Sequence, residues 1–244
     1  MGATGSSRKR ALKSGGSLTA AALVVVLLAV VRSSPAAAHC PDAGNNGYHY
    51  VSGGNGNHNF KSVRTRIGWI HSPNVCNSIS AYSISIVRTS GADTGWLQVG
   101  WVFRAGYTKP MGYCERNPLP SGTGTYALTE YTVPEQAQFY TYEKNDVDTF
   151  ECKINGVLER STPEAYIGFI NGGWVPVQAE ALANQVQLGR VAPDWLAFTA
   201  TDRIVAGGTA WSAMTVGGVG SDDPVWNFRQ PVTDGFEVNT DATH

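Results

Sequence analysis

The stretch GWLQVGWVFR, residues 95–104, decides the fold class that we predict for this chain. Side chains alternate between the two faces of a β-strand, so every second residue points the same way. The odd positions are all large and apolar, and we expect them to enter a core: Leu97, Val99, Trp101 and Phe103. The opposite face carries Trp96 and the amide of Gln98. That mixture is typical of a binding surface.

A second stretch, WVPVQAEAL over residues 174–182, repeats this arrangement. Read as a strand, it points Val175, Val177, Ala179 and Ala181 inward, and Trp174, Gln178 and Glu180 to the other face. We therefore predict a groove floored by Trp96, Gln98, Trp174, Gln178 and Glu180. Residues 178–188 are also rich in good helix formers, so strand and short helix both stay open for the segment that holds Glu180.

Short alternating segments with turns every 8–12 residues follow one another along the chain, which is typical of an all-β domain. Asn155-Gly156 is a strong hairpin signal between two such segments. We read residues 106–124, with three X-Pro pairs, as a long loop and residues 165–170 as a strand. The predicted fold is an antiparallel two-sheet β-sandwich of the jelly-roll type.

Residues 1–38 have the features of a secretory signal peptide. Basic residues come first, an apolar run over residues 18–31 follows, and Ala36-Ala37-Ala38 offers a cleavage site. We expect export to the extracellular space. Residues 39–62, rich in Gly and Asn, are expected to form an irregular N-terminal segment, and residues 63–244 the sandwich domain.

The charge balance excludes one class of partner. The first 38 residues hold five of the 18 basic residues and none of the 19 acidic ones, which leaves 13 basic and 19 acidic residues and a net charge of −6. Nucleic acids need a basic footprint, so we expect no nucleic-acid partner. We also expect no membrane association after signal cleavage, and a monomer.

Four cysteines follow the predicted cleavage site: Cys40, Cys76, Cys114 and Cys152. An even number in an exported chain indicates two disulfides, for which three connectivities exist. We favour Cys40–Cys76 and Cys114–Cys152, because these pairings close the shorter loops. The wide spacing is unlike that of zinc ligands, so we expect no metal and no cofactor.

Common catalytic motifs are absent from the sequence, including G-x-S-x-G, H-E-x-x-H and the dinucleotide fingerprint. Carboxylate and amide chemistry remains. Glu180, in an apolar setting, can activate a water as a general base, and Gln98 can donate to a developing oxyanion. The alternative is that Glu180 is a solvated surface acid and both glutamines bond to strand neighbours.

The segment Trp96-Leu97-Gln98-Val99-Gly100-Trp101 resembles the strand of the eqolisins, the fungal glutamic peptidases, that carries their catalytic Gln. Ala179-Glu180 resembles the strand with their catalytic Glu, although Ala181 stands where the family has Trp, and its further acid is replaced near Asn184. The resemblance implies a concanavalin-like sandwich and peptide hydrolysis in acid. The chain also resembles actinobacterial secreted proteins related to the neprosin and eqolisin sandwich.

A binding module is the competing interpretation. Trp96 and Trp174 can stack on sugar rings, so the same groove can hold a glycan or a peptide without catalysis. A glycosidase needs two carboxyl groups at a defined distance, and Glu130 is the candidate for a second acid.

Overall fold

The strand β1 (His49–Ile67) belongs to both layers of the structure. The computed structural model describes residues 48–76, 78–182 and 186–240. From His49 to Gly56, β1 pairs with β9 (Gly172–Ala181). From Phe60 onward it lies between β11 (Leu196–Val205) and β6 (Gln138–Lys144). A strand that bends from one sheet into the other makes a corner of the sandwich.

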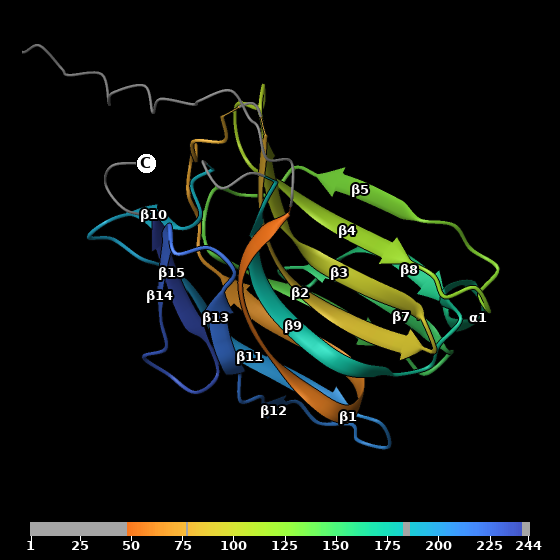
Figure 1. Cartoon of the computed structure of the whole chain (residues 1–244). Coiled ribbons are helices and arrows are strands. Elements are labelled where there is room, and N and C mark those ends of the chain that lie inside the picture. Colours follow the sequence, from red (N-terminus) through yellow and green to blue (C-terminus); the bar gives the residue numbers. More distant parts are fainter. Residues whose placement is uncertain (1–47, 77, 183–185, 241–244) are drawn as a thin grey trace, which may run out of the picture. The chain divides into compact units, whose positions relative to one another are not determined.

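The first sheet is antiparallel and carries the predicted site. Its order is β13, β1, β9, β2, β3, β4, β5. The remaining bounds are β2 (Ile79–Ser90), β3 (Asp93–Arg104), β4 (Met111–Asn117), β5 (Ala127–Tyr131) and β13 (Gly217–Ser221). Figure 1 shows β9, β2, β3, β4 and β5 side by side as long, twisted ribbons.

The second sheet has the order β10, β15, β11, β1, β6, β7, β8, with β12 beside β11 and β14 beside β15. All of its pairs are antiparallel except β10 with β15. Its other elements are β7 (Thr149–Ile154), β8 (Val157–Pro163), β10 (Arg190–Val191), β12 (Ser212–Ala213), β14 (Trp226–Arg229) and β15 (Phe236–Thr240). In Figure 1, β7 and β8 lie behind β3 and β4. The fold is the predicted two-sheet sandwich.

The core between the sheets contains every residue that the alternation pointed inward. Leu97, Val99, Trp101 and Phe103 are buried, as are Val175, Val177, Ala179 and Ala181. Trp101 stacks on Tyr82 with ring centroids 4.0 Å apart and donates its Nε1–H to the Gly68 carbonyl oxygen over 2.9 Å. Each large apolar side chain buried in this way contributes roughly 2–3 kcal/mol.

The irregular segment predicted over residues 39–62 is wrong for residues 49–62, which belong to β1, and residues 39–47 lie outside the described residues. The glycines serve close packing within a strand. A Cβ at Gly53 would come within 2.8 Å of the side chains of Val216 and Val219, and one at Gly54 within 2.6 Å of the Val175 carbonyl oxygen. Glycine in a strand marks this kind of close approach.

Two local predictions are also wrong. Residues 106–124 are not a continuous loop, because β4 lies within them, with Pro110 and Pro118 at its borders where they interrupt no ladder. Residues 165–170 do not form a strand. After β8 the chain forms the short helix α1 (Glu164–Ile167) instead. This helix ends at Gly168, whose backbone is in the left-handed conformation. The Asn155-Gly156 hairpin between β7 and β8 is confirmed.

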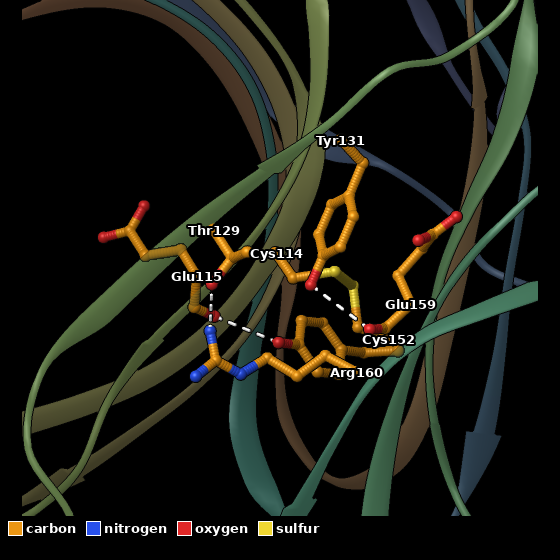
Figure 2. The surroundings of a disulfide bond; sticks show 8 residues. Cys114, Glu115, Thr129, Tyr131, Cys152, Glu159 and Arg160 are labelled. Atoms are coloured by element: carbon orange, nitrogen blue, oxygen red, sulfur yellow. Dashed lines mark hydrogen bonds between the residues drawn. A yellow bond between two sulfur atoms is a disulfide. The ribbon is translucent and has the colours of Figure 1, made fainter.

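The predicted Cys114–Cys152 disulfide is confirmed, and it joins β4 of the first sheet to β7 of the second. Two hydrogen bonds between β5 and β8 lie beside the disulfide in Figure 2. Tyr131 OH donates to the Glu159 carbonyl oxygen over 3.2 Å, and Arg160 donates to Thr129 Oγ1. Cys76 is also disulfide-bonded. Cys40 lies outside the described residues, so its pairing stays a prediction.

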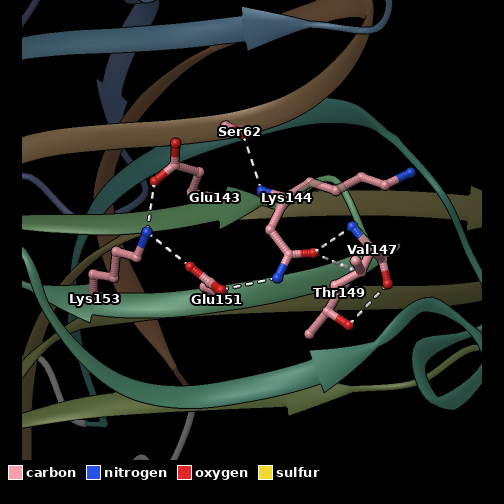
Figure 3. Close-up of polar contacts among 8 residues, drawn as sticks. Ser62, Glu143, Lys144, Val147, Thr149, Glu151 and Lys153 are labelled. Atoms are coloured by element: carbon pink, nitrogen blue, oxygen red, sulfur yellow. Dashed lines mark hydrogen bonds and ion pairs between the residues drawn. The ribbon is translucent and has the colours of Figure 1, made fainter. Parts of the chain in front are cut away.

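The outer face of the second sheet is held by a polar network at the β6–β7 turn (Figure 3). Lys153 lies 2.9 Å from a Glu143 carboxylate oxygen and 2.8 Å from one of Glu151. The Asn145 side-chain oxygen Oδ1 accepts the backbone N–H groups of Val147 and Thr149, which fixes the turn. Lys153 is shared by the two carboxylates, and Glu151 also accepts a hydrogen bond from Asn145 Nδ2.

No helix in the described part of the chain has the length and apolar character that a membrane span requires. Residues 1–38, predicted to be a signal peptide, lie outside the described residues, and that prediction stays open.

The disulfide between the sheets should contribute strongly to stability. We expect the double variant C114A/C152A to lose about 3–4 kcal/mol of unfolding free energy, since the bond closes a loop with a sequence separation of 38 residues. Urea unfolding followed by tryptophan fluorescence measures the change. The double variant is preferable to a reducing agent, which would also open the Cys76 disulfide. An unchanged unfolding midpoint would contradict the expectation.

Candidate functional site

The side chain of Gln98 is held by residues on both neighbouring strands. Ser83 on β2, Gly100 on β3 and Tyr113 on β4 lie directly opposite one another. Gln98 is two residues from Gly100 on the same face of β3, and its Nε2 lies 2.8 Å from Ser83 Oγ and 2.8 Å from Tyr113 OH. The amide is thus clamped from both sides.

Gly100 makes room for this clamp. A Cβ at this position would lie 1.8 Å from the Tyr82 carbonyl oxygen, so only glycine fits. The backbone of β2 occupies the place of the missing side chain, so β2 and β3 approach closely here and Ser83 comes within reach of the Gln98 amide. A buried amide needs partners for its polar atoms, and the two hydroxyl groups supply them.

Glu180 reaches the same pocket from β9, across β2. Its register neighbours are Ala81 on β2 and Tyr50 on β1. Because Ala81 is small, the carboxyl group of Glu180 extends over it toward β3, close enough to the Gln98 side chain for the amide to lower the pKa of the carboxyl group. Gln178 Nε2 also donates to Glu180 Oε1. The structure therefore brings together the amide and the acid that the sequence predicted to act as a pair.

The two groups open into a pocket of about 440 Å³ on the outer face of the first sheet. Its walls combine aromatic, aliphatic and charged side chains. The lining residues are Tyr48, Ile79, Ala81, Trp96, Gln98, Val102, Arg104, Tyr113, Glu115, Tyr126, Leu128 and Glu180. The pocket has the size and the mixed character of a small-ligand or peptide side-chain site.

Burial raises the pKa of Glu180 to about 7, and the nearby Glu115 carboxylate adds to the rise, while the hydrogen bond from Gln98 opposes it. Burial also raises the pKa of Glu115 against hydrogen bonds from Trp96 and Tyr126. The Tyr113 pKa lies well above its usual range for the same reason, so this hydroxyl stays protonated. A carboxyl group with a pKa near neutrality is suited to proton transfer.

Glu115 is the functional candidate that the sequence analysis missed. It lies on β4 directly opposite Gln98, and its Oε1 accepts the Trp96 Nε1–H over 3.0 Å. Figure 2 shows its carboxyl group pointing away from the disulfide at Cys114. The signal was present in the alternation of Tyr113 and Glu115 about the core residue Cys114, but the loop interpretation concealed it.

The other predicted groove residues are only partly brought together. Trp96 lines the pocket, and Gln178 supports Glu180 without lining it. Trp174 lies on the same face of β9 with 47% of its surface exposed, but six residues of strand, roughly 20 Å, separate it from Glu180. Trp174 therefore lies outside this pocket, and its place in one groove with the other four residues stays a prediction.

Glu130 does not supply the second acid of the pocket. Its carboxylate is 2.8 Å from Arg104 Nε and also accepts a hydrogen bond from Tyr107, and it does not line the pocket. Within the described ranges no group of three His, Cys, Asp or Glu side chains is placed to hold a metal ion. The absence of a cofactor stays a prediction.

Comparisons with known proteins place this geometry in a known fold. No family model matches the chain, and no curated protein matches it by sequence. A crystal structure of scytalido-glutamic peptidase with a peptide-based transition state analog superposes with a TM-score of 0.51 at 9% identity, over 79% of this chain and 98% of that one. The chain has the fold of this glutamic peptidase.

Two further structures show lower similarity. SCP-B, an eqolisin-family peptidase in complex with the tripeptide Ala-Ile-His, gives a TM-score of 0.47 at 9% identity, over 79% of this chain and 98% of that one. A family 16 endo-glucanase from Bacteroides ovatus gives 0.35 at 7% identity, over 56% of this chain and 66% of that one. The neprosin-type part of the resemblance and the actinobacterial source stay predictions.

The raised pKa of Glu180 predicts how stability depends on pH. Folded Glu180 keeps its proton up to about pH 7, whereas an ordinary carboxyl group loses it near 4.5. Between these values the folded chain binds more protons than the unfolded chain, so this group's contribution is complete below about pH 4.5 and is lost as pH rises through 7. Glu180→Gln should flatten that decline in urea unfolding measured at several pH values. An identical decline in parent and variant would contradict the shifted pKa.

Proposed function

We propose that this protein hydrolyses peptide bonds, with Glu180 as general base and Gln98 as oxyanion donor. The observation that carries the proposal is the presence of a buried carboxyl group and a side-chain amide together in the lining of one open pocket. It is supported by a fold shared with a glutamic peptidase whose solved complex contains a peptide-based transition state analog.

The chemistry needs one water and the two side chains. The Glu180 carboxylate takes a proton from water, whose oxygen attacks the peptide carbonyl carbon. The carbonyl electrons move onto its oxygen, and a Gln98 N–H donates to the resulting oxyanion. The tetrahedral intermediate then breaks its C–N bond while the Glu180 carboxyl group returns the proton to the leaving nitrogen. The products are a carboxylic acid and an amine.

Ser83 and Tyr113 fit this mechanism as positioning groups. Both are buried, and each hydroxyl carries one donor and two acceptor sites. In the structure Gln98 donates both N–H groups of Nε2 to these two hydroxyl oxygens. For the oxyanion to be stabilised, one of these N–H groups must turn from its hydroxyl to the substrate while the other stays bound and orients the amide. Gln178 holds Glu180 in the same way, through a donated hydrogen bond.

The pKa of Glu180 changes the expected pH dependence. The resemblance to eqolisins implies hydrolysis in acid, but a general base with a pKa of about 7 is ionised mainly above that value. We therefore propose that activity rises with pH through about 7. Export through the predicted signal peptide completes the proposal, and the confirmed Cys114–Cys152 disulfide supports it, since such bonds form in oxidising compartments.

Substitution of the pair should abolish hydrolysis without unfolding the chain. We expect Glu180→Gln and Gln98→Ala each to lower kcat for casein or a fluorogenic peptide by roughly 100-fold or more, since removing an oxyanion donor alone has an effect of this size. Glu135→Gln, which changes an exposed acid of the same type, is the matched control and should keep full activity.

The pH profile of the parent distinguishes the roles of Glu180. A rise in kcat/KM through about pH 7 supports the general base, whereas a fall through the same value would assign Glu180 to proton donation. Activity that survives both substitutions would remove the proposed mechanism.

A binding module remains the second candidate, and one observation favours it. Trp174, Val87 and Trp96 are aligned across β9, β2 and β3, so two tryptophans share one row of the first sheet about 10 Å apart. Exposed aromatic side chains in a row can stack on consecutive sugar rings of a glycan. In this function Glu180 would be a binding group and not a base.

The glycan hypothesis predicts that Trp174→Ala weakens binding of an oligosaccharide found by array screening by about tenfold, the effect of losing one stacking partner worth roughly 1.4 kcal/mol. Isothermal titration calorimetry measures the change. Phe228→Ala is the control, because Phe228 is 42% exposed but lies on β14 of the second sheet. Equal losses in both variants, or none in either, would reject stacking on Trp174.

A further inference from the structure

We propose that the pocket recognises a lysine or arginine side chain of a peptide through Glu115, next to the bond that is cleaved. The inference rests on the proposed function and names its substrate class. It starts from a carboxylate that faces an open pocket and forms no ion pair within the described residues.

The Glu115 carboxylate lies in the pocket without an ion-pair partner among the residues that the structure describes. In the described part of the chain, no lysine, arginine or histidine forms an ion pair with Glu115. Arg104 lines the same pocket and lowers the pKa of Glu115 through its charge, but its Nε is 2.8 Å from a Glu130 carboxylate oxygen, so this guanidinium is paired with Glu130. Glu115 therefore faces the pocket without an ion pair of its own, which an incoming cation would supply.

The walls around Glu115 suit a long cationic side chain. Trp96 donates to Oε1, which holds the carboxylate in place before a ligand arrives, and Tyr126 lies close enough to lower the pKa of Glu115. Tyr48 and Tyr126 stand at the rim with 66% and 56% of their surfaces exposed. Aromatic faces attract ammonium and guanidinium groups, and a carboxylate gives them a charge-assisted hydrogen bond.

The apolar residues of the pocket fit the rest of such a side chain. Val102 and Leu128 line the pocket together with the aromatic rings. Lysine and arginine carry three or four methylene groups that pack on apolar surface while the charged end reaches a polar partner. An acidic substrate side chain would instead meet the carboxylate of Glu115.

The register of β3 and β4 indicates how far the basic residue of the substrate is from the cleaved bond. Glu115 is directly opposite Gln98 in the β3–β4 pair, so their Cβ atoms are about 5 Å apart. The reacting carbonyl group is placed at Gln98, and consecutive peptide residues are 3.8 Å apart. The basic residue therefore lies within one or two positions of the cleaved bond.

The test measures binding separately from hydrolysis. Blocked alanine-rich peptides carry a single lysine, norleucine or glutamate at each position in turn, and they are titrated into the Glu180→Gln variant at near-neutral pH. We expect lysine to bind about tenfold more tightly than norleucine at one position, as a charge-assisted hydrogen bond would give, and glutamate more weakly than both. High salt should reduce the lysine advantage.

The second variant is Glu115→Gln in the same background. Its carbonyl oxygen still accepts from Trp96, so it removes the charge and keeps the shape, and the lysine advantage should disappear. Asp93→Asn, which neutralises an exposed acid at the far end of β3, is the control and should keep it.

Each result has a clear meaning. No lysine advantage at any position, or an advantage that survives Glu115→Gln, would overturn the inference. Binding of an amino-sugar oligomer but of no peptide, dependent on Glu115, would overturn the peptide assignment. Because the binding assay needs no turnover, a parent protein without peptidase activity could still bind lysine peptides, and an active parent could still show no lysine preference.

Discussion

The meeting of the Gln98 amide and the Glu180 carboxyl group in one pocket is the constraint on which the functional site depends. It joins two strands that are not neighbours, since β2 lies between them. The contact is possible only because the residues of β2 and β3 beneath it are small: Ala81, Ser83 and Gly100. A larger residue at position 81 or 83 would fill the space through which the two polar groups meet, and any side chain at Gly100 would collide with the Tyr82 backbone.

Burying this pair has a cost, which the surrounding groups reduce. An amide and a carboxyl group removed from water need hydrogen-bond partners, and Ser83, Tyr113 and Gln178 supply them. The carboxyl group retains its proton to a higher pH than usual because its surroundings are poor in water and a second acid is close. The same features that make the site costly to bury thus prepare Glu180 for proton transfer.

The two-sheet architecture keeps these strands in register. β1 serves both layers, and the Cys114–Cys152 bond ties β4, the strand of Tyr113 and Glu115, to the sheet behind it. The site is thereby built on strands and not on loops. Strand-borne side chains are held more rigidly than loop-borne ones, which favours a fixed donor geometry.

Much of the fold could be predicted because alternation is a local property. Residues 95–104 and 174–182 showed which side chains enter the core, and the Asn155-Gly156 turn marked its hairpin. The predictions were wrong where they rested on composition and not on alternation. The glycines in residues 49–62 indicated a loop, but they belong to a closely packed strand. The prolines near β4 also indicated a loop, but they only border that strand. The error at β4 also concealed Glu115.

By itself the sequence determined the all-β class, the inward faces of two strands and the outward positions of Gln98 and Glu180, because each depends on the order of residues along one segment. Only the tertiary structure decided that Glu115 joins them, that Glu130 is paired with Arg104, and that Trp174 lies about 20 Å along the strand from Glu180. Which strands become neighbours, and in which register, depends on long-range pairing that no single segment encodes.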